Sequence, residues 1–248
     1  MEKLSSDIMV VIISSVTAIL TTLISFYIKN RHTENEVNKK VINEYLDPLL
    51  IITNDFRDKL KDLIKRVNKN DTILKDTFKQ LSDNFAGSSS SIYYELWKND
   101  NEFIKWSNQM GHYSMSLLYV TALYFSRAYY IRTKLPFLKL KKSTDKELLN
   151  RIDYVRISLG GEFGIWSEIQ DSAGIFIKKE KENEFMNFWE FCYEIFVNKK
   201  YYFFYKVIDF YECFDKKTEK QKEDMIDSLE LLSSYLDEIR IDKKLSLV

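Results

Sequence analysis

The chain has 248 residues, with 37 Lys and Arg against 37 Asp and Glu, so its formal net charge is zero. This balance argues against a nucleic-acid-binding protein that neutralises phosphates. A content of 45% hydrophobic and 30% charged residues excludes a disordered chain and a polytopic membrane protein. Six glycines and two prolines are too few turn residues for a sandwich, a barrel or a doubly wound sheet, so we expect an all-α fold.

The first predicted element is a transmembrane helix over residues 8–28. These residues carry no charge, and a helix of this length measures about 31 Å, enough to cross a hydrocarbon core of about 30 Å. A cleaved signal peptide is the alternative, but its apolar stretch is shorter and ends at small residues. Residues 26–31 read Phe-Tyr-Ile-Lys-Asn-Arg, which favours an uncleaved anchor over residues 1–31.

Basic residues predict the orientation of this anchor. Lys29, Arg31, Lys39 and Lys40 follow the span closely, whereas only Lys3 precedes it. Because an excess of Lys and Arg stays in the cytoplasm, we expect a single-pass protein with its N-terminus outside and its C-terminal domain in the cytoplasm. The four basic residues after the span are then expected at the membrane interface, with the lipid bilayer as a partner.

Small residues lie on one face of the predicted span, at Ser14, Ala18, Thr22 and Ser25. Four-residue spacing of small side chains lets membrane helices approach closely, so this stripe is a candidate face for self-association. The alternative is that Ser and Thr are only tolerated in a single span.

A juxtamembrane stalk over residues 32–47 and a helical domain over residues 48–248 are predicted next. Asp47-Pro48 is typical of a new helix start, with an N-cap followed by proline in the first turn. Apolar residues then recur at three- and four-residue steps, which predicts helices over 49–67 and 74–85. Gly87 and the serines 88–91 predict a loop, and a further helix is expected over 93–106.

The second half of the chain continues the helical pattern. A long helix is predicted over 111–134, ended by Pro136, and we interpret it as a core helix rather than a second membrane span because polar residues crowd its first half. Shorter helices are expected over 148–159, 165–176 and 185–195, followed by a buried aromatic segment over 201–214. The last helix carries apolar residues at alternating four- and three-residue steps, which predicts a bundle seam; these residues are Met225, Leu229, Leu232, Leu236 and Ile239.

Three tracts of the chain carry a resemblance. They are Tyr45-Leu-Asp-Pro-Leu49, residues 119–140 with the ending Leu-Pro-Phe-Leu-Lys-Leu, and Phe163-Gly-Ile-Trp-Ser-Glu-Ile-Gln-Asp-Ser-Ala-Gly174. In these tracts the chain resembles an uncharacterised group of bacterial single-pass membrane proteins. The resemblance implies an N-terminal membrane segment followed by a helical cytoplasmic domain, here in the bacterial inner membrane, and it brings no activity or catalytic residue.

Few residues suggest chemistry. Two distant cysteines give neither a disulfide framework nor a zinc site, and we expect no metal and no cofactor. The glycines at 160, 161 and 164 follow a helix, which favours a helix end and a turn over a phosphate-binding loop. The weak catalytic candidates are His112, Glu162, Glu168 and Asp171. Paired carboxylates can hold a cation or act as acid and base, but they can equally pair with an arginine at 127, 132, 151 or 156 inside a bundle.

The sequence therefore predicts a membrane-anchored, non-enzymatic interaction module with a protein partner or a second copy as its target. A sensor, a scaffold or an effector of anti-phage defence has such an architecture, the last by analogy alone. Two alternatives stay open. One is a membrane-tethered enzyme with a carboxylate and histidine pocket, and the other is a self-assembling effector that disrupts membranes.

Overall fold

The computed structural model describes residues 2–71, 76–81, 105–109, 111–134, 142–179, 184–196 and 204–245. Side chains are described from Ser14 onward, except at Lys142, Phe196 and residues 243–245. Within these ranges the structure is helical, and the only β contact is an isolated bridge between Lys178 and Phe185. The all-α prediction is confirmed. The loop predicted at 87–91 and most of the helix predicted over 93–106 lie outside the described residues.

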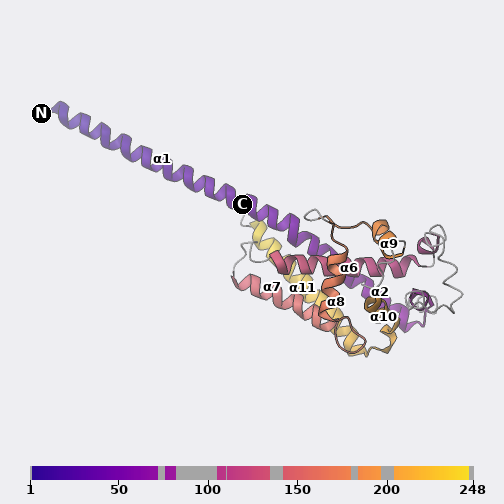
Figure 1. Ribbon diagram of the computed structural model, residues 1–248. Helices are drawn as coiled ribbons and strands as arrows, with labels where there is room; N and C mark the ends of the chain where they lie inside the picture. Colours follow the sequence, from indigo (N-terminus) through magenta and orange to yellow (C-terminus); the bar gives the residue numbers. More distant parts are fainter. Residues whose placement is uncertain are drawn as a thin grey trace.

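A single continuous helix forms the N-terminal part of the molecule (Figure 1). It comprises α1 (Glu2–Val41), a π-helical turn η1 (Ile42–Leu46) and α2 (Asp47–Asn68). Asp47 is itself helical, with φ −60° and ψ −46°, and the residue before it has no capping side chain. An α-helical segment does begin at Asp47, with Pro48 in its first turn as predicted, but Asp47 is not an N-cap and the chain is already helical before it. Proline lacks an N–H and crowds the preceding turn, and here the wider π turn lies just ahead of Pro48, so the helix continues through it.

The core of the bundle begins inside the predicted stalk. Val41, Ile42 and Leu46 are at most 4% exposed, although they belong to the segment 32–47. Tyr45 also stacks on Tyr130 of α6, with ring centroids 5.6 Å apart. The helix that leaves the bundle is thus anchored in the core before α2 begins.

Five helices form a closed ring around the main core. They are α2, α6 (His112–Lys134), α8 (Ser167–Phe176), α7 (Lys142–Ser158) and α11 (Glu219–Leu245). In this order each packs on the next, and α11 closes the ring against α2. The seam predicted for the last helix is confirmed, because its five apolar residues are all buried.

Smaller helices cover one end of this ring. These are α9 (Phe188–Phe196), α10 (Tyr205–Glu212) and the 3₁₀ turn η4 (Phe214–Lys216). Within the predicted aromatic segment 201–214, Phe204, Phe210 and Phe214 are fully buried, whereas Tyr205 is 42% exposed. Residues 201–203 are outside the described part.

Glycines set the contact between α6 and α8 and the turn before α8. A Cβ on Gly174 would lie 2.7 Å from the backbone carbon of Phe125, so only glycine lets the two helices approach this closely. The turn uses Gly161 at φ +79° and Phe163 at φ +53°, and Gly164 N–H donates to the Gly161 carbonyl at 3.0 Å. The cluster of three glycines is a helix end and a turn, as predicted.

Helix α1 extends away from the bundle (Figure 1). All the side chains of residues 14–34 are exposed, including the predicted packing stripe Ser14, Ala18, Thr22 and Ser25. The Thr21 and Thr22 hydroxyls donate to carbonyls four residues earlier, each at 2.8 Å. No helix is both long and apolar enough to cross a membrane where side chains are described. The predicted span begins at Ile8, and the side chains of residues 8–13 lie outside that part.

The basic residues expected at a membrane interface lie further along α1. Lys29, Arg31, Lys39 and Lys40 are all exposed. Lys39 lies 3.4 Å from a Glu36 oxygen, and Lys40 lies 3.9 Å from a Glu44 oxygen. Exposed pairs of this kind add little to stability, so these lysines stay accessible to other charges.

Candidate functional site

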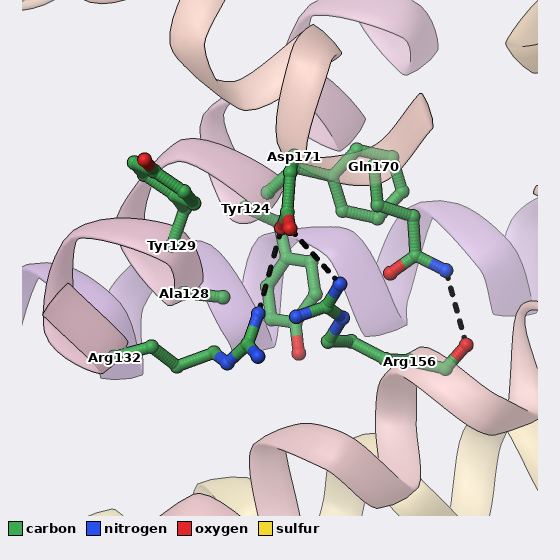
Figure 2. Close-up of a pocket in the computed structure, with 8 residues that line it drawn as sticks. Tyr124, Ala128, Tyr129, Arg132, Arg156, Gln170 and Asp171 are labelled. Atoms are coloured by element: carbon green, nitrogen blue, oxygen red, sulfur yellow. Dashed lines mark hydrogen bonds and ion pairs between the residues drawn. The ribbon is translucent and has the colours of Figure 1, made fainter. Parts of the chain in front are cut away.

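A polar crevice lies where α6, α7 and α8 meet (Figure 2). Helix α6 contributes Tyr124, Ala128 and Arg132, which are four residues apart and therefore share one face. Arg156 comes from the last turns of α7, and α8 adds Gln170 and Asp171 from its first turns. The close approach of α8 to α6 at Gly174 brings these side chains together.

Two arginines converge on Asp171 (Figure 2). Arg156, only 8% exposed, donates from Nη2 to Asp171 Oδ2 at 3.1 Å and to the Ser167 carbonyl at 3.2 Å. Arg132 Nη1 lies 3.5 Å from Asp171 Oδ1, and its Nε lies 3.6 Å from Asp153 Oδ1. Burial raises the pKa of the Asp171 carboxyl, and Arg132 offsets part of this rise. Four charges, two of each sign, thus meet at one place.

Gln170 connects α7 to the turn before α8. Its side chain is 2% exposed, and Nε2 donates to the Arg156 carbonyl at 3.0 Å and to the Ile165 carbonyl at 2.7 Å. Both partners are acceptors, so they fix the orientation of the amide and leave Oε1 as its acceptor. The Gln170 amide thus satisfies one backbone carbonyl in the last turn of α7.

Three buried polar atoms in the crevice have no hydrogen-bond partner among the described residues. They are the Tyr124 hydroxyl, Arg156 Nη1 and Gln170 Oε1. The crevice itself has a volume of about 10 Å³. It adjoins an open depression of about 380 Å³, because Tyr129, Arg132 and Asp171 line both. The rest of the depression is lined by Thr133, Leu149 and Asp153.

Of the four catalytic candidates, only Asp171 lies at this crevice. Glu168 and Glu162 are exposed, and their backbone carbonyls accept side-chain hydrogen bonds from Ser172 and from Lys217 respectively. For Asp171, the alternative of pairing with arginines inside the bundle is the arrangement found.

His112 lies far from Asp171. It begins α6, whereas Arg132, which contacts Asp171, lies near the end of the same helix. At 1.5 Å per residue the two are about 30 Å apart. The His112 ring is exposed and meets the Phe188 ring edge-on at 5.5 Å. A single pocket that joins His112 to Asp171 is therefore not formed.

Metal-binding geometry is also missing from the described residues, since no group of three or more His, Cys, Asp or Glu side chains lies together in them. Cys192 and Cys213 are free and buried. Burial raises the pKa of the Cys192 thiol to about 12, which keeps it protonated and a poor nucleophile near neutral pH. The chemistry that the crevice offers is recognition by hydrogen bonds and ion pairs.

Sequence reasoning did not single out Tyr124 or Gln170 as members of a site. A signal for Tyr124 exists, since Arg132 lies two turns along on the same helical face, but nothing in the chain places Arg156 opposite them.

A scan of protein families, a search of curated proteins and a search of solved structures found no match to this chain.

Proposed function

We propose that the protein is a membrane-anchored, non-enzymatic interaction module. One observation carries the proposal: large apolar side chains are 50–65% exposed on α1, the helix that extends away from the bundle. They are Val16, Ile19, Leu20, Leu23, Ile24, Phe26, Tyr27 and Ile28. A continuous apolar surface of this kind marks a contact with lipid or protein. Together with the uncharged sequence from residue 8, it favours a single membrane span over residues 8–28.

The residues that flank the predicted span suggest its orientation, and the continuous helix after it suggests how the bundle is held at the membrane. The basic residues after the span favour an outside N-terminus and a bundle in the cytoplasm, at the bacterial inner membrane. Because α1, η1 and α2 are continuous, the anchor would join the core of the bundle without a flexible linker. Tethering raises the effective concentration of the bundle for a protein partner or a second copy. The role as sensor, scaffold or defence effector rests on analogy of architecture.

Membrane extraction tests the anchor. The wild-type chain is expected to stay in the membrane pellet after alkaline carbonate washing. A lysine near the centre of a membrane helix raises the free energy of insertion by about 2.5–3.5 kcal/mol. The double variant with lysine at Ile19 and Leu23 is therefore expected in the supernatant. Ile51→Lys is the matched control, because Ile51 is 61% exposed on α2 and outside the span. Release of the wild-type chain by carbonate would contradict the anchor.

Cross-linking in native membranes, followed by purification of the full chain and mass spectrometry, tests the interaction module. A stoichiometric foreign protein, or specific multimers of the chain, is the expected result. A monomer without any specific cross-link would contradict the module.

The second candidate is a membrane-disrupting assembly through the stripe Ser14, Ala18, Thr22 and Ser25. It is favoured by the exposure of all four side chains on one face of α1. Ala18→Leu is expected to abolish membrane leakage and multimers if the stripe assembles. Unchanged multimers in Ala18→Leu would exclude this candidate and leave the interaction module.

A further inference from the structure

The crevice between α6, α7 and α8 is an incomplete hydrogen-bonding environment. Tyr124 is fully buried, Gln170 is 2% exposed and Arg156 is 8% exposed, yet each carries a polar atom with no partner among the described residues. Buried polar atoms are nearly always paired, and leaving one unpaired costs free energy. Tyr124, Arg132 and Arg156 line this crevice together (Figure 2). Arg156 Nη1 is a donor, Gln170 Oε1 is an acceptor, and the Tyr124 hydroxyl can donate or accept, so the inner end of the crevice is suited to a polar atom such as a ligand oxygen or a water.

The open depression beside the crevice presents one pair of opposite charges. The Arg132 side chain is 31% exposed and the Asp153 side chain is 50% exposed. Their 3.6 Å separation, like the 3.5 Å between Arg132 and Asp171, is longer than an ordinary N–H···O hydrogen bond. Arg132 therefore retains donors, and Asp153 retains acceptor positions, that face the depression.

The charges select the class of ligand. Arg132 and Arg156 balance Asp153 and Asp171, so the site is neutral as a whole. A dianion such as phosphate would meet two carboxylates, and a simple cation would meet two guanidinium groups. A molecule with one carboxylate and one ammonium matches both halves, because arginine binds a planar carboxylate through two hydrogen bonds and aspartate accepts from an ammonium.

The size and walls of the depression fit a small molecule of this class. Its volume of about 380 Å³ lies at the lower end of the usual range for ligand sites. Tyr129 and Leu149 are half-buried and supply a ring face and an apolar wall beside the charged pair. The inner crevice, about 10 Å³, admits one atom of water size, either a ligand oxygen or a bridging water.

We propose that this depression binds a small zwitterion of the free α-amino acid class. Its carboxylate lies against Arg132 with one oxygen directed towards the Tyr124 hydroxyl and Arg156 Nη1, and its ammonium lies against Asp153. The side chain of the ligand contacts Tyr129 and Leu149. This site goes beyond the proposed membrane anchor and does not depend on it, since all its residues belong to the bundle.

Binding to the purified full-length chain in mild detergent tests the proposal. The probes are the twenty L-amino acids at millimolar concentration, with thermal unfolding as the first readout and calorimetry as the second. At least one amino acid is expected to raise the unfolding midpoint by binding the folded state. For each one that binds, the amine without the carboxylate and the acid without the ammonium are expected to bind at least tenfold more weakly.

Variants test the assignment of residues. Asp153→Asn and Arg132→Gln are each expected to weaken amino acid binding about tenfold, which corresponds to about 1.4 kcal/mol. Asp153 is half exposed, so Asp153→Asn is expected to fold normally. If Arg132→Gln does not fold, the binding measured for Asp153→Asn still tests the site. Arg151→Gln is the control on the same helix, because Arg151 pairs instead with Glu147 at 2.8 Å.

Several results would overturn the proposal. They are the absence of binding by every amino acid, equally tight binding of the acid alone or of the amine alone, and binding that Asp153→Asn leaves unchanged. None of these results bears on membrane extraction, so failure of the ligand site and failure of the anchor are distinguishable.

Discussion

Gly174→Ala adds a methyl group at the closest contact between α6 and α8. The new Cβ would lie 2.7 Å from the Phe125 backbone carbon, 2.8 Å from its oxygen and 2.8 Å from the Ser126 nitrogen. Ordinary contacts begin near 3.4 Å, so the helices must separate by about 0.7 Å. No side-chain rotation can relieve the overlap, because all three atoms belong to the backbone.

The expected cost follows from two opposing terms. Overpacking a core lowers the free energy of unfolding by about 1–3 kcal/mol. The contact here is with rigid backbone, so we expect a loss near the upper end of this range. Replacing glycine by alanine inside a helix returns about 1 kcal/mol. We therefore expect Gly174→Ala to lower the free energy of unfolding by about 2 kcal/mol. The shift also moves Gln170 and Asp171 away from α6, so the variant is expected to lose amino acid binding as well.

Urea unfolding of the full-length chain, followed by circular dichroism, measures this cost. With a slope of about 2–3 kcal/mol per molar urea, the midpoint is expected to fall by about 0.8 M. Ser172→Ala is the control on the same helix, because that position already has a Cβ and the change affects only helix propensity and one local hydrogen bond to the Glu168 carbonyl. A midpoint for Gly174→Ala at or above that of the wild type would refute the steric argument.

Three further predictions concern the backbone, a buried charge and a thiol. Gly161→Ala is expected to lower the free energy of unfolding in urea by about 1 kcal/mol, because φ at this position is +79°. The added Cβ meets nothing within 4 Å, so backbone strain alone accounts for the loss. An unchanged free energy of unfolding would show that the turn relaxes freely. Burial lowers the pKa of the Lys217 ammonium from its usual value of 10.5. Below the folded-state pKa the charged form therefore destabilises the fold, and this loss of stability disappears as the pH rises towards 10.5. Lys217→Met is therefore expected to be more stable than the wild type at pH 7, by a margin that shrinks at alkaline pH, and a margin constant with pH would contradict this cause. Cys192, in a Cys213→Ser background, is expected to resist a thiol reagent at pH 8 until the chain unfolds; rapid labelling of the folded chain would show that its thiol is neither buried nor protonated.

Local sequence was enough to predict the helical class and the main helices. The scarcity of glycine and proline excluded sheets, and the three- and four-residue apolar spacing predicted α6 and the seam of α11, since this spacing places side chains on one face regardless of what that face meets. The glycines 160, 161 and 164 likewise predicted a turn, because backbone freedom is a property of the residue itself. The membrane span over residues 8–28 remains a prediction from composition and length.

Tertiary structure decided the continuity of the first helix and the membership of the crevice. Asp47-Pro48 is compatible with both a helix start and a proline inside a helix, and the π turn before it, with Ile42 and Leu46 packed in the core, selects the second. Arg132 and Asp171 meet because Gly174 lets α8 approach α6, a contact between segments far apart in the chain. Periodicity tells which residues share a face, but only packing between helices determines which faces meet and which charges are brought together there.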